Sequence, residues 1–305
     1  MLQVLRVTSF TQLQEELYRG SWNPAIARFR SPCLFRGVSR ADFDMRTSLL
    51  RLGGEAWRLE EHLLRNFRKY AHREVVPFDD DWNWVALGQH HGLPTRLLDW
   101  TYSPYVAMHF ATADTDDFDR DGAIIVVDFV KAHELLPQAL QDILREHGSQ
   151  VFTTELLRQY ARTLRRFDDR NRELSHEDFV LFFEPPSLDE RITNQFAVFS
   201  VMSKPQLTLV DWLAHNPTIC RKLVIDRAIK WEVRDKLDQA NVTERVLFPG
   251  LDGLSRWLAR HYVQVESTAG LDDRHGEEGT SSLAAGPGAG DRPGAEGTRG
   301  PGEEG

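Results

Sequence analysis

Hydrophobic and polar residues alternate along the first 265 positions with two different periods. A period near 3.6 predicts helices over residues 10–17, 55–73, 82–89, 104–113, 131–146, 150–167, 229–239 and 251–262. Continuous or alternating apolar runs predict strands over residues 33–38, 123–129, 179–184, 191–201 and 222–226. Helices and strands are interleaved along the chain. We therefore expect an α/β (α+β) fold with a single domain, built on a small mixed sheet flanked by helices.

Residues 87–111 combine polar and apolar side chains more densely than any other stretch. Leucine and tryptophan alternate there with the polar residues Gln89, His90, His91, Thr95, Arg96 and Asp99. Polar groups among buried apolar ones must be hydrogen-bonded, because their desolvation is otherwise costly. The pattern predicts a buried polar network, which is either structural or part of a binding site.

The last forty residues have a different composition. Residues 266–305 hold 11 of the 21 glycines, three of the 14 prolines, and nine acidic residues against three arginines. So few apolar side chains cannot offset the entropy of ordering the chain, which predicts a disordered, acidic Gly/Pro/Glu-rich tail. We expect an N-terminal helical lead-in over residues 1–27 and one domain over residues 28–265.

Charge and cysteine content exclude several classes of function. The net charge of the chain is −9, of which the tail carries −6, and no basic stripe is present, so nucleic-acid binding is not expected. The two cysteines, Cys33 and Cys220, lie far apart in apolar contexts, which argues against a disulfide framework. No signal-peptide core and no long apolar run occurs. We expect a soluble, cytoplasmic protein without a membrane partner.

Common catalytic motifs are missing from the sequence. It contains no H-E-x-x-H zinc motif, no G-x-S-x-G elbow, no Walker loop and no G-x-G-x-x-G. The adjacent side chains of His90 and His91 point apart, so they do not suit a single metal ion. No metal site is predicted.

Two residues outside the dense stretch suit an anion. Arg36 lies on the strand over residues 33–38, between Leu34 and Val38, and it either extends to water or faces a carboxylate or phosphate. Ser103, followed by Pro104, is typical of a helix N-cap, and the N-terminus of a helix attracts phosphate.

Other polar residues have structural alternatives. Arg96 and Asp99 are three positions apart among apolar residues, which favours a structural ion pair. Gln195 begins an apolar strand, where its amide either faces a cleft or satisfies a neighbouring backbone group.

Several motifs together resemble the FRG domain family, which is named for an F/Y-R-G motif. Phe35-Arg36-Gly37 matches that motif, and Gln89-His90-His91-Gly92-Leu93-Pro94-Thr95-Arg96-Leu97-Leu98-Asp99-Trp100-Thr101 matches the family signature Q-H-x-G-x-P-T-R-L-L-D-W-T. Arg191-Ile192 with Gln195 and Phe199 looks like a third block, with Phe196-Ala197 where a glycine is usual. Residues 248–254 look like the closing block. The resemblance spans about residues 28–262.

The order of these blocks is also loosely similar to ADP-ribosyltransferases of the Arg-Ser-Glu type, which implies a split sheet and NAD as the substrate. In that resemblance Arg36 faces phosphate, and Gln89, His91, Thr95 and Gln195 hold ribose and nicotinamide groups. His90 and Ser103 are further candidates for cofactor binding, with Ser103 placed to hold a phosphate. Gln195 stands in the place of the catalytic Glu but cannot supply a negative charge. Glu184 and Glu190 are the nearest acids, so the candidate catalytic residues are Gln195, Glu184 and Glu190.

Two hypotheses follow for the function. The first is an ADP-ribosyltransferase-like pocket that binds NAD or a related nucleotide and transfers ADP-ribose to an unidentified acceptor or cleaves NAD. The second is a non-catalytic interaction module in which the dense stretch is only a structural network. The first requires Arg36, residues 89–99 and Gln195 to line one cleft.

Overall fold

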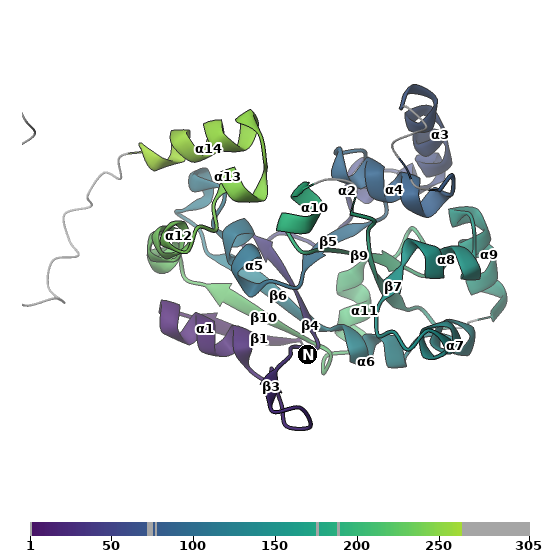
Figure 1. Cartoon of the computed structure of the whole chain (residues 1–305), viewed down its shortest axis with the longest axis horizontal. Coiled ribbons are helices and arrows are strands. Elements are labelled where there is room, and N and C mark those ends of the chain that lie inside the picture. The colour runs from purple at the N-terminus through teal and green to yellow at the C-terminus, as the bar shows by residue number, and fades with distance from the viewer. Residues whose placement is uncertain (1, 72–75, 77, 175–176, 188–189, 264–305) are drawn as a thin grey trace, which may run out of the picture. The chain divides into compact units, whose positions relative to one another are not determined.

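An eight-stranded mixed sheet forms the centre of the computed structural model, which describes residues 2–71, 76, 78–174, 177–187 and 190–263 (Figure 1). Its strand order is β1-β10-β6-β4-β5-β9-β8-β7. The strands are β1 (Gln3–Val7), β4 (Cys33–Val38), β5 (Leu98–Thr101), β6 (Gly122–Asp128), β7 (Phe152–Thr153), β8 (Val180–Glu184), β9 (Ala197–Met202) and β10 (Cys220–Ile225). Only the pairs β1–β10 and β7–β8 are parallel among the paired strands of this sheet.

The predicted α/β class is confirmed, but the sheet is larger than the small one expected. Three of its strands, β1, β5 and β7, were not predicted, because runs of two to five residues are too short for a clear alternation. β1 pairs with β10, so residues 1–27 contribute to the main sheet as well as to a helix. The predicted disordered tail over residues 266–305 lies outside the described residues.

The pairing between neighbouring strands of the sheet is shortest between β4 and β5. These strands share one residue pair, Phe35 with Thr101, whereas β4 makes six pairs with β6 and β5 makes four with β9. No other residue pair joins these two strands in the described part of the chain. The sheet therefore consists of two halves that meet at a single point in the middle.

Most of the predicted helices are present, but two are divided. The run over residues 131–146 forms two helices, and the run over residues 150–167 forms a short strand followed by parts of two helices. The helices are α1 (Phe10–Tyr18), α2 (Ser48–Arg51), α3 (Glu60–Tyr70), α4 (Asp81–His90), α5 (Pro104–Ala111), α6 (Phe129–Glu134), α7 (Gln138–Glu146), α8 (Thr154–Tyr160), α9 (Leu164–Leu174), α10 (Glu190–Asn194), α11 (Leu209–His215), α12 (Lys230–Gln239), α13 (Glu244–Leu247) and α14 (Leu251–His261), with 3-10 turns η1 (Ala56–Leu59), η3 (Thr115–Asp117) and η4 (Arg227–Ile229). Ser9, Asp80 and Ser103 cap α1, α4 and α5 by accepting a backbone hydrogen bond.

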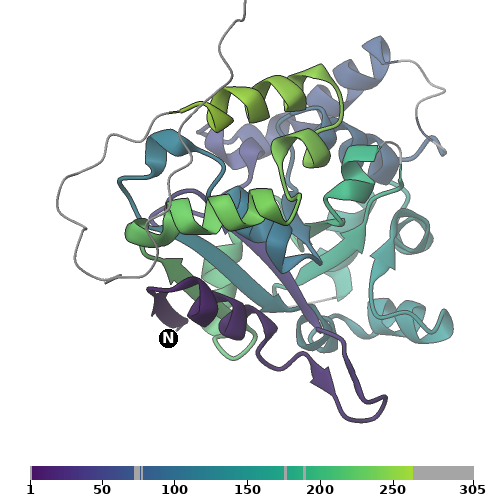
Figure 2. The same cartoon turned by 60° about the vertical axis from the view of Figure 1, so that its left-hand side comes forward.

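Three hydrophobic clusters pack these helices against the sheet. One face of the half that contains β4 and β6 is covered by α1, α5 and α12. The same side of the other half is covered by α4, α8 and α9, together with α3 and α7. The opposite face of both halves packs against α6 and α11. Figure 2 shows α12 and α14 in front of the sheet, away from α7 and α8.

Gly37 explains why β4 and α5 lie so close together. A Cβ atom at position 37 would lie 1.9 Å from the backbone oxygen of Ala107 and 2.7 Å from the backbone nitrogen of Ala111. No side chain fits at that distance, so the glycine of the Phe35-Arg36-Gly37 motif is required by packing. It brings the end of β4 against α5 and leaves Arg36 beside the gap between the half-sheets.

The strand predicted over residues 191–201 is only half correct. Residues 190–194 form α10, Phe196 turns the chain with a φ of 48°, and β9 begins at Ala197. None of the described helices has the length and apolar character that crossing a lipid bilayer requires.

Candidate functional site

The gap between the half-sheets opens into a cavity of about 220 Å³. β4 lines it with Phe35, Arg36 and Gly37, and β5 lines it with Asp99, Trp100 and Thr101. The remaining lining residues come from α4, α5, α10 and the start of β9: Gln89, His90, Phe110, Arg191, Ile192, Gln195, Ala197 and Phe199. The structure thus brings Arg36, the Gln89–Asp99 stretch and Gln195 to one cavity.

Arg36 spans the gap between β4 and β5. Its Nη1 donates to the backbone oxygen of Asp99 at 2.5 Å and lies 3.6 Å from the Asp99 carboxylate. Its Nε is buried and has no hydrogen-bond partner among the described residues. Burial lowers the pKa of the guanidinium, Asp99 opposes this shift, and Arg51 adds to it. The site therefore holds a poorly solvated cation with an unused donor.

Gln89 fixes the orientation of the Asp99 side chain. Its Nε2 lies 3.0 Å from both carboxylate oxygens of Asp99, and its Oε1 accepts a hydrogen bond from Thr95 Oγ1 at 2.5 Å. Thr95 is buried and also accepts from the backbone nitrogen of Leu97. Thr95 therefore acts behind the cavity wall, and Asp99, whose side chain is 59% exposed, faces the open cleft.

The predicted ion pair between Arg96 and Asp99 is wrong. Arg96 is buried, and it pairs instead with Glu60 at 2.5 Å and with Asp168 at 2.6 Å. Near an extended strand, side chains three positions apart point to opposite sides, so Arg96 and Asp99 cannot meet. Arg96 joins the start of β5 to α3 and α9, which makes it part of the scaffold.

Gln195 lines the cavity from the turn between α10 and β9. Its Nε2 donates to the backbone oxygen of Leu247 at 2.9 Å, and its own backbone oxygen accepts from Thr101 Oγ1 at 2.7 Å. The residue therefore ties β5 and α13 to the cavity wall. The amide nitrogen of Gln195 therefore already satisfies a backbone oxygen, which is the structural role considered for this residue from the sequence.

The remaining candidates lie in three different places. Glu184 accepts a hydrogen bond from the hydroxyl of Tyr102 at 2.9 Å and does not line the cavity. Ser103 is used as the cap of α5 and does not line it either. Glu190 and His91 line an adjoining hollow beside His90.

The central cavity continues in two directions. One neighbouring hollow, of about 330 Å³, shares Arg36, Gln89 and Asp99 with it and adds Arg46 and Arg51. The other, of about 380 Å³, shares His90 and Arg191 and adds Arg256, Phe248 and Asp252. The shared lining residues make the three hollows one cleft, with a partly apolar middle and arginines at both ends.

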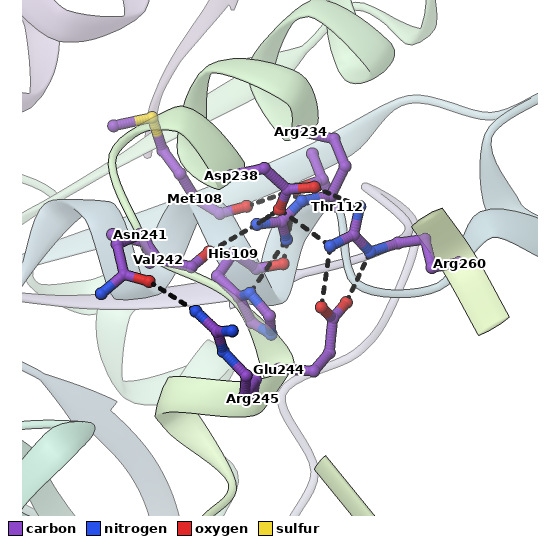
Figure 3. A network of polar contacts seen from close by, with 10 residues as sticks. All are labelled: Met108, His109, Thr112, Arg234, Asp238, Asn241, Val242, Glu244, Arg245 and Arg260. Atoms are coloured by element: carbon purple, nitrogen blue, oxygen red, sulfur yellow. Dashed lines mark hydrogen bonds and ion pairs between the residues drawn. The ribbon is translucent and has the colours of Figure 1, made fainter. Parts of the chain in front are cut away.

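A buried polar network supports the wall of this cleft (Figure 3). His109 on α5 accepts a hydrogen bond from Arg234 Nη1 at 2.9 Å, and Arg260 on α14 pairs with Glu244 and Asp238. Burial lowers the pKa of His109 to about 3, and the neighbouring guanidinium adds to the shift. His109 is therefore neutral, and the network fastens α12, α13 and α14 to α5.

Several residues of the cleft, among them Asp99 and Arg191, were not predicted as site residues. Asp99 had been assigned to the scaffold, although the alternation Leu98-Asp99-Trp100 places it on the side opposite two buried residues. Arg191 donates to the backbone oxygen of His90. It lies on a helix of five residues, which is too short to show a helical hydrophobic period in the sequence. Within the described part of the chain, no cluster of three or more His, Cys, Asp or Glu residues is placed to hold a metal ion.

Residues 31–120 match the model of the FRG domain. The chain contains an FRG domain. The matched region runs from β4 through α5 and includes Arg36, Gly37, Gln89 and Asp99. Arg191 and Gln195 lie beyond the region matched to the FRG domain and complete the cavity from α10. No curated protein and no solved structure matches the chain.

Proposed function

We propose that the cleft of this FRG-domain protein is an ADP-ribosyltransferase-like pocket that binds NAD or a related nucleotide. The observation that carries the proposal is Arg36. Its guanidinium is largely withdrawn from water and donates to a backbone oxygen at the wall of the central cavity, and its buried Nε has no partner in the part of the chain that the structure describes. A phosphate oxygen would complete its hydrogen bonds and offset its desolvation.

The walls of the cavity suit a flat ring. Phe35, Phe110 and Phe199 line it together with Ile192, and polar atoms converge from Gln195 and Thr101. Most small-molecule sites combine apolar walls with a few polar groups in this way. Nicotinamide or adenine has the shape and the amide-like edges that such a pocket accepts.

The length of the cleft favours a dinucleotide over a mononucleotide. The central cavity alone is smaller than the usual ligand site of several hundred Å³, but the two adjoining hollows extend it on both sides. Arg51 lies at one end and Arg256 at the other, and Arg256 stacks on Phe248 at 5.2 Å. A ligand with one ring in the central cavity, a diphosphate beside Arg36 and a second ring in the hollow that Arg51 lines matches this distribution.

ADP-ribosyl transfer or NAD cleavage belongs to the same proposal, but its support is weaker. Asp99 is the acid that lines the central cavity, and its carboxylate is engaged by Gln89 and lies near Arg36. Glu190 lines the adjoining hollow, and Glu184 lies outside the cavity. The geometry therefore supports binding more strongly than transfer.

A non-catalytic interaction module is the second candidate. It is favoured by the hydrogen bonds among Gln89, Thr95 and Asp99, which satisfy one another within the protein. In this case the signature residues hold the fold together, and no nucleotide enters the cleft.

Titration calorimetry of the full chain with NAD, ADP-ribose and nicotinamide distinguishes these functions, together with chromatographic detection of released nicotinamide. We expect NAD and ADP-ribose to bind, and Arg36→Gln to weaken their binding at least tenfold. Arg40→Gln is the matched control, because Arg40 pairs with Asp42 at 2.7 Å outside the cleft. Absence of binding by all three compounds would favour the interaction module. Binding without nicotinamide release would restrict the proposal to a binding protein.

A further inference from the structure

We propose that the hairpin formed by β2 (Trp22–Asn23) and β3 (Arg28–Phe29) binds an anionic lipid surface. This hairpin is a two-stranded sheet of its own, separate from the central one. It projects from the body of the protein in both views (Figure 1 and Figure 2). The proposal stands apart from the nucleotide site, since the hairpin lines none of the hollows of the cleft.

The hairpin exposes three large apolar side chains, Ile26 in its turn and the pair Trp22 and Phe29 at the other end of its strands. Trp22 is 51% exposed, Ile26 is 53% exposed and Phe29 is 61% exposed. Trp22 and Phe29 are register partners, and their rings meet edge to face with centroids 5.2 Å apart. A soluble protein gains nothing from presenting an aromatic pair to water, so this cluster indicates a contact surface.

The charge around this apolar tip is positive. Residues 17–41 contain no Asp or Glu, in a chain whose net charge is −9. Of the five arginines in this stretch, three lie outside the hairpin and have carboxylate neighbours, and the other two are Arg28 and Arg30. Arg28 and Arg30 are exposed, and Arg30 donates a hydrogen bond to the backbone oxygen of Phe29. Neither arginine pairs with a carboxylate among the residues that the structure describes.

Lipid is the occupant that this chemistry fits. Alternation along β3 places Arg28 and Arg30 on one side of the hairpin and Phe29 with Trp22 on the other. A hairpin that enters tip first would put Ile26 at the acyl boundary, with the arginines on one side and the aromatic rings on the other at the level of the lipid phosphates. That none of the described helices could span a bilayer does not bear on this contact, because a peripheral hairpin reaches only the interface.

Co-sedimentation of the full chain with vesicles tests the proposal. Vesicles of phosphatidylcholine alone are compared with vesicles that contain one third phosphatidylserine. We expect binding to the anionic vesicles only, with a marked loss in raised salt. The charge reversal Arg28→Glu/Arg30→Glu should lower the bound fraction about tenfold, and Trp22→Ser/Phe29→Ser should abolish binding.

Matched variants elsewhere on the surface serve as controls. Leu251→Ser removes an apolar side chain that is 79% exposed on α14, and Arg165→Glu/Arg166→Glu reverses two charges on α9. Both should bind vesicles like the parent chain, and circular dichroism checks that every variant is folded. The proposal is overturned if anionic vesicles do not bind the chain or if the hairpin variants bind them normally. It is also overturned if light scattering shows that the hairpin variants change only the oligomeric state, which would identify a second copy as the partner.

Discussion

Where β4 meets β5, Arg36 is joined to Asp99 by a hydrogen bond to the Asp99 backbone oxygen as well as by the attraction between their charges. The guanidinium donates to the Asp99 backbone oxygen at 2.5 Å, while the carboxylate lies farther away at 3.6 Å and is held by Gln89. This arrangement separates two roles. The backbone bond positions Arg36, and the carboxylate sets the charge of the cleft.

That separation makes Asp99→Asn informative. The substitution keeps the backbone oxygen that holds Arg36 and removes one negative charge from the cleft. We expect ADP-ribose to bind several-fold more tightly, because repulsion between its phosphates and the carboxylate disappears. Calorimetry measures the effect, with Asp42→Asn as the control outside the cleft. If nicotinamide release is detected in the parent chain, the same variant should reduce it. Unchanged or weaker binding would show that Asp99 does not face the phosphates.

Arg96→Met should destabilise the fold by about 3–5 kcal/mol. The substitution leaves Glu60 and Asp168 buried without their shared cation, and removing one partner of a buried ion network costs more than the network itself contributes. Urea denaturation measures the change in the free energy of unfolding. Arg172→Met is the control, since its ion pair with Asp169 is exposed and should be worth less than about 1 kcal/mol. Similar losses for both variants would contradict a scaffold role for Arg96.

Gly37→Ala should be among the most damaging small substitutions in the chain. The new methyl group would overlap the backbone oxygen of Ala107, and a backbone atom in a packed helix cannot move aside. We expect a loss of more than about 3 kcal/mol or failure to fold. Gly88→Ala is the comparison, because its Cβ would approach side-chain atoms of Leu93, at 2.8 Å from Cδ2 and 3.3 Å from Cβ, and no backbone atom as closely. Thermal denaturation of both variants checks the difference, and a stable Gly37→Ala protein would mean that β4 and α5 are not in close contact.

Acid should destabilise the protein through His109. In the folded state the pKa of His109 is lowered to about 3 from an ordinary value of 6.5, so between these values the unfolded chain binds a proton that the folded chain does not. Its contribution to stability is therefore complete above pH 6.5 and is lost as the pH falls toward 3. His133, with a pKa lowered to about 4 by burial, acts in the same direction.

Urea denaturation from neutral pH down to about pH 4 measures this slope, which is about 1.4 kcal/mol per pH unit for one proton. His109→Gln keeps an acceptor for Arg234 but does not titrate, so it should flatten the slope by about one proton. His215→Gln changes an exposed histidine on α11 and should leave the slope unaltered. An equal slope in the parent chain and His109→Gln would show that His109 is not buried as a neutral group.

Local sequence patterns predicted most of the helices and strands but few of the residues with which their side chains interact. The cap at Ser103 and the strand over residues 33–38 could be predicted, because hydrogen bonds and alternation within a few residues determine them. The partners of Arg96 were not readable, because Glu60 and Asp168 lie 36 and 72 positions away.

Some residues of the site could be predicted from local sequence patterns, and others could not. The motif around Arg36 and the signature around Gln89 pointed to the cavity wall, and strand alternation would have placed Asp99 there as well. The segment from Arg191 to Gln195 was predicted as a strand because Ile192 and the apolar residues from Phe196 onward continue the pattern of β9. The turn at Phe196, which brings Arg191 and Gln195 into the cleft, has no signature in the sequence.

The pairing of β1 with β10 has a consequence for synthesis on the ribosome. Gln3 is the register partner of Arg221, so the first strand must wait for almost the whole folded unit before it finds its neighbour. Until then β6 also lacks its neighbour β10, and its apolar edge is open to other chains. A nascent chain released before residue 225 would therefore carry an unpaired central strand, and premature termination in this region should lead to aggregation, not to a shorter working domain.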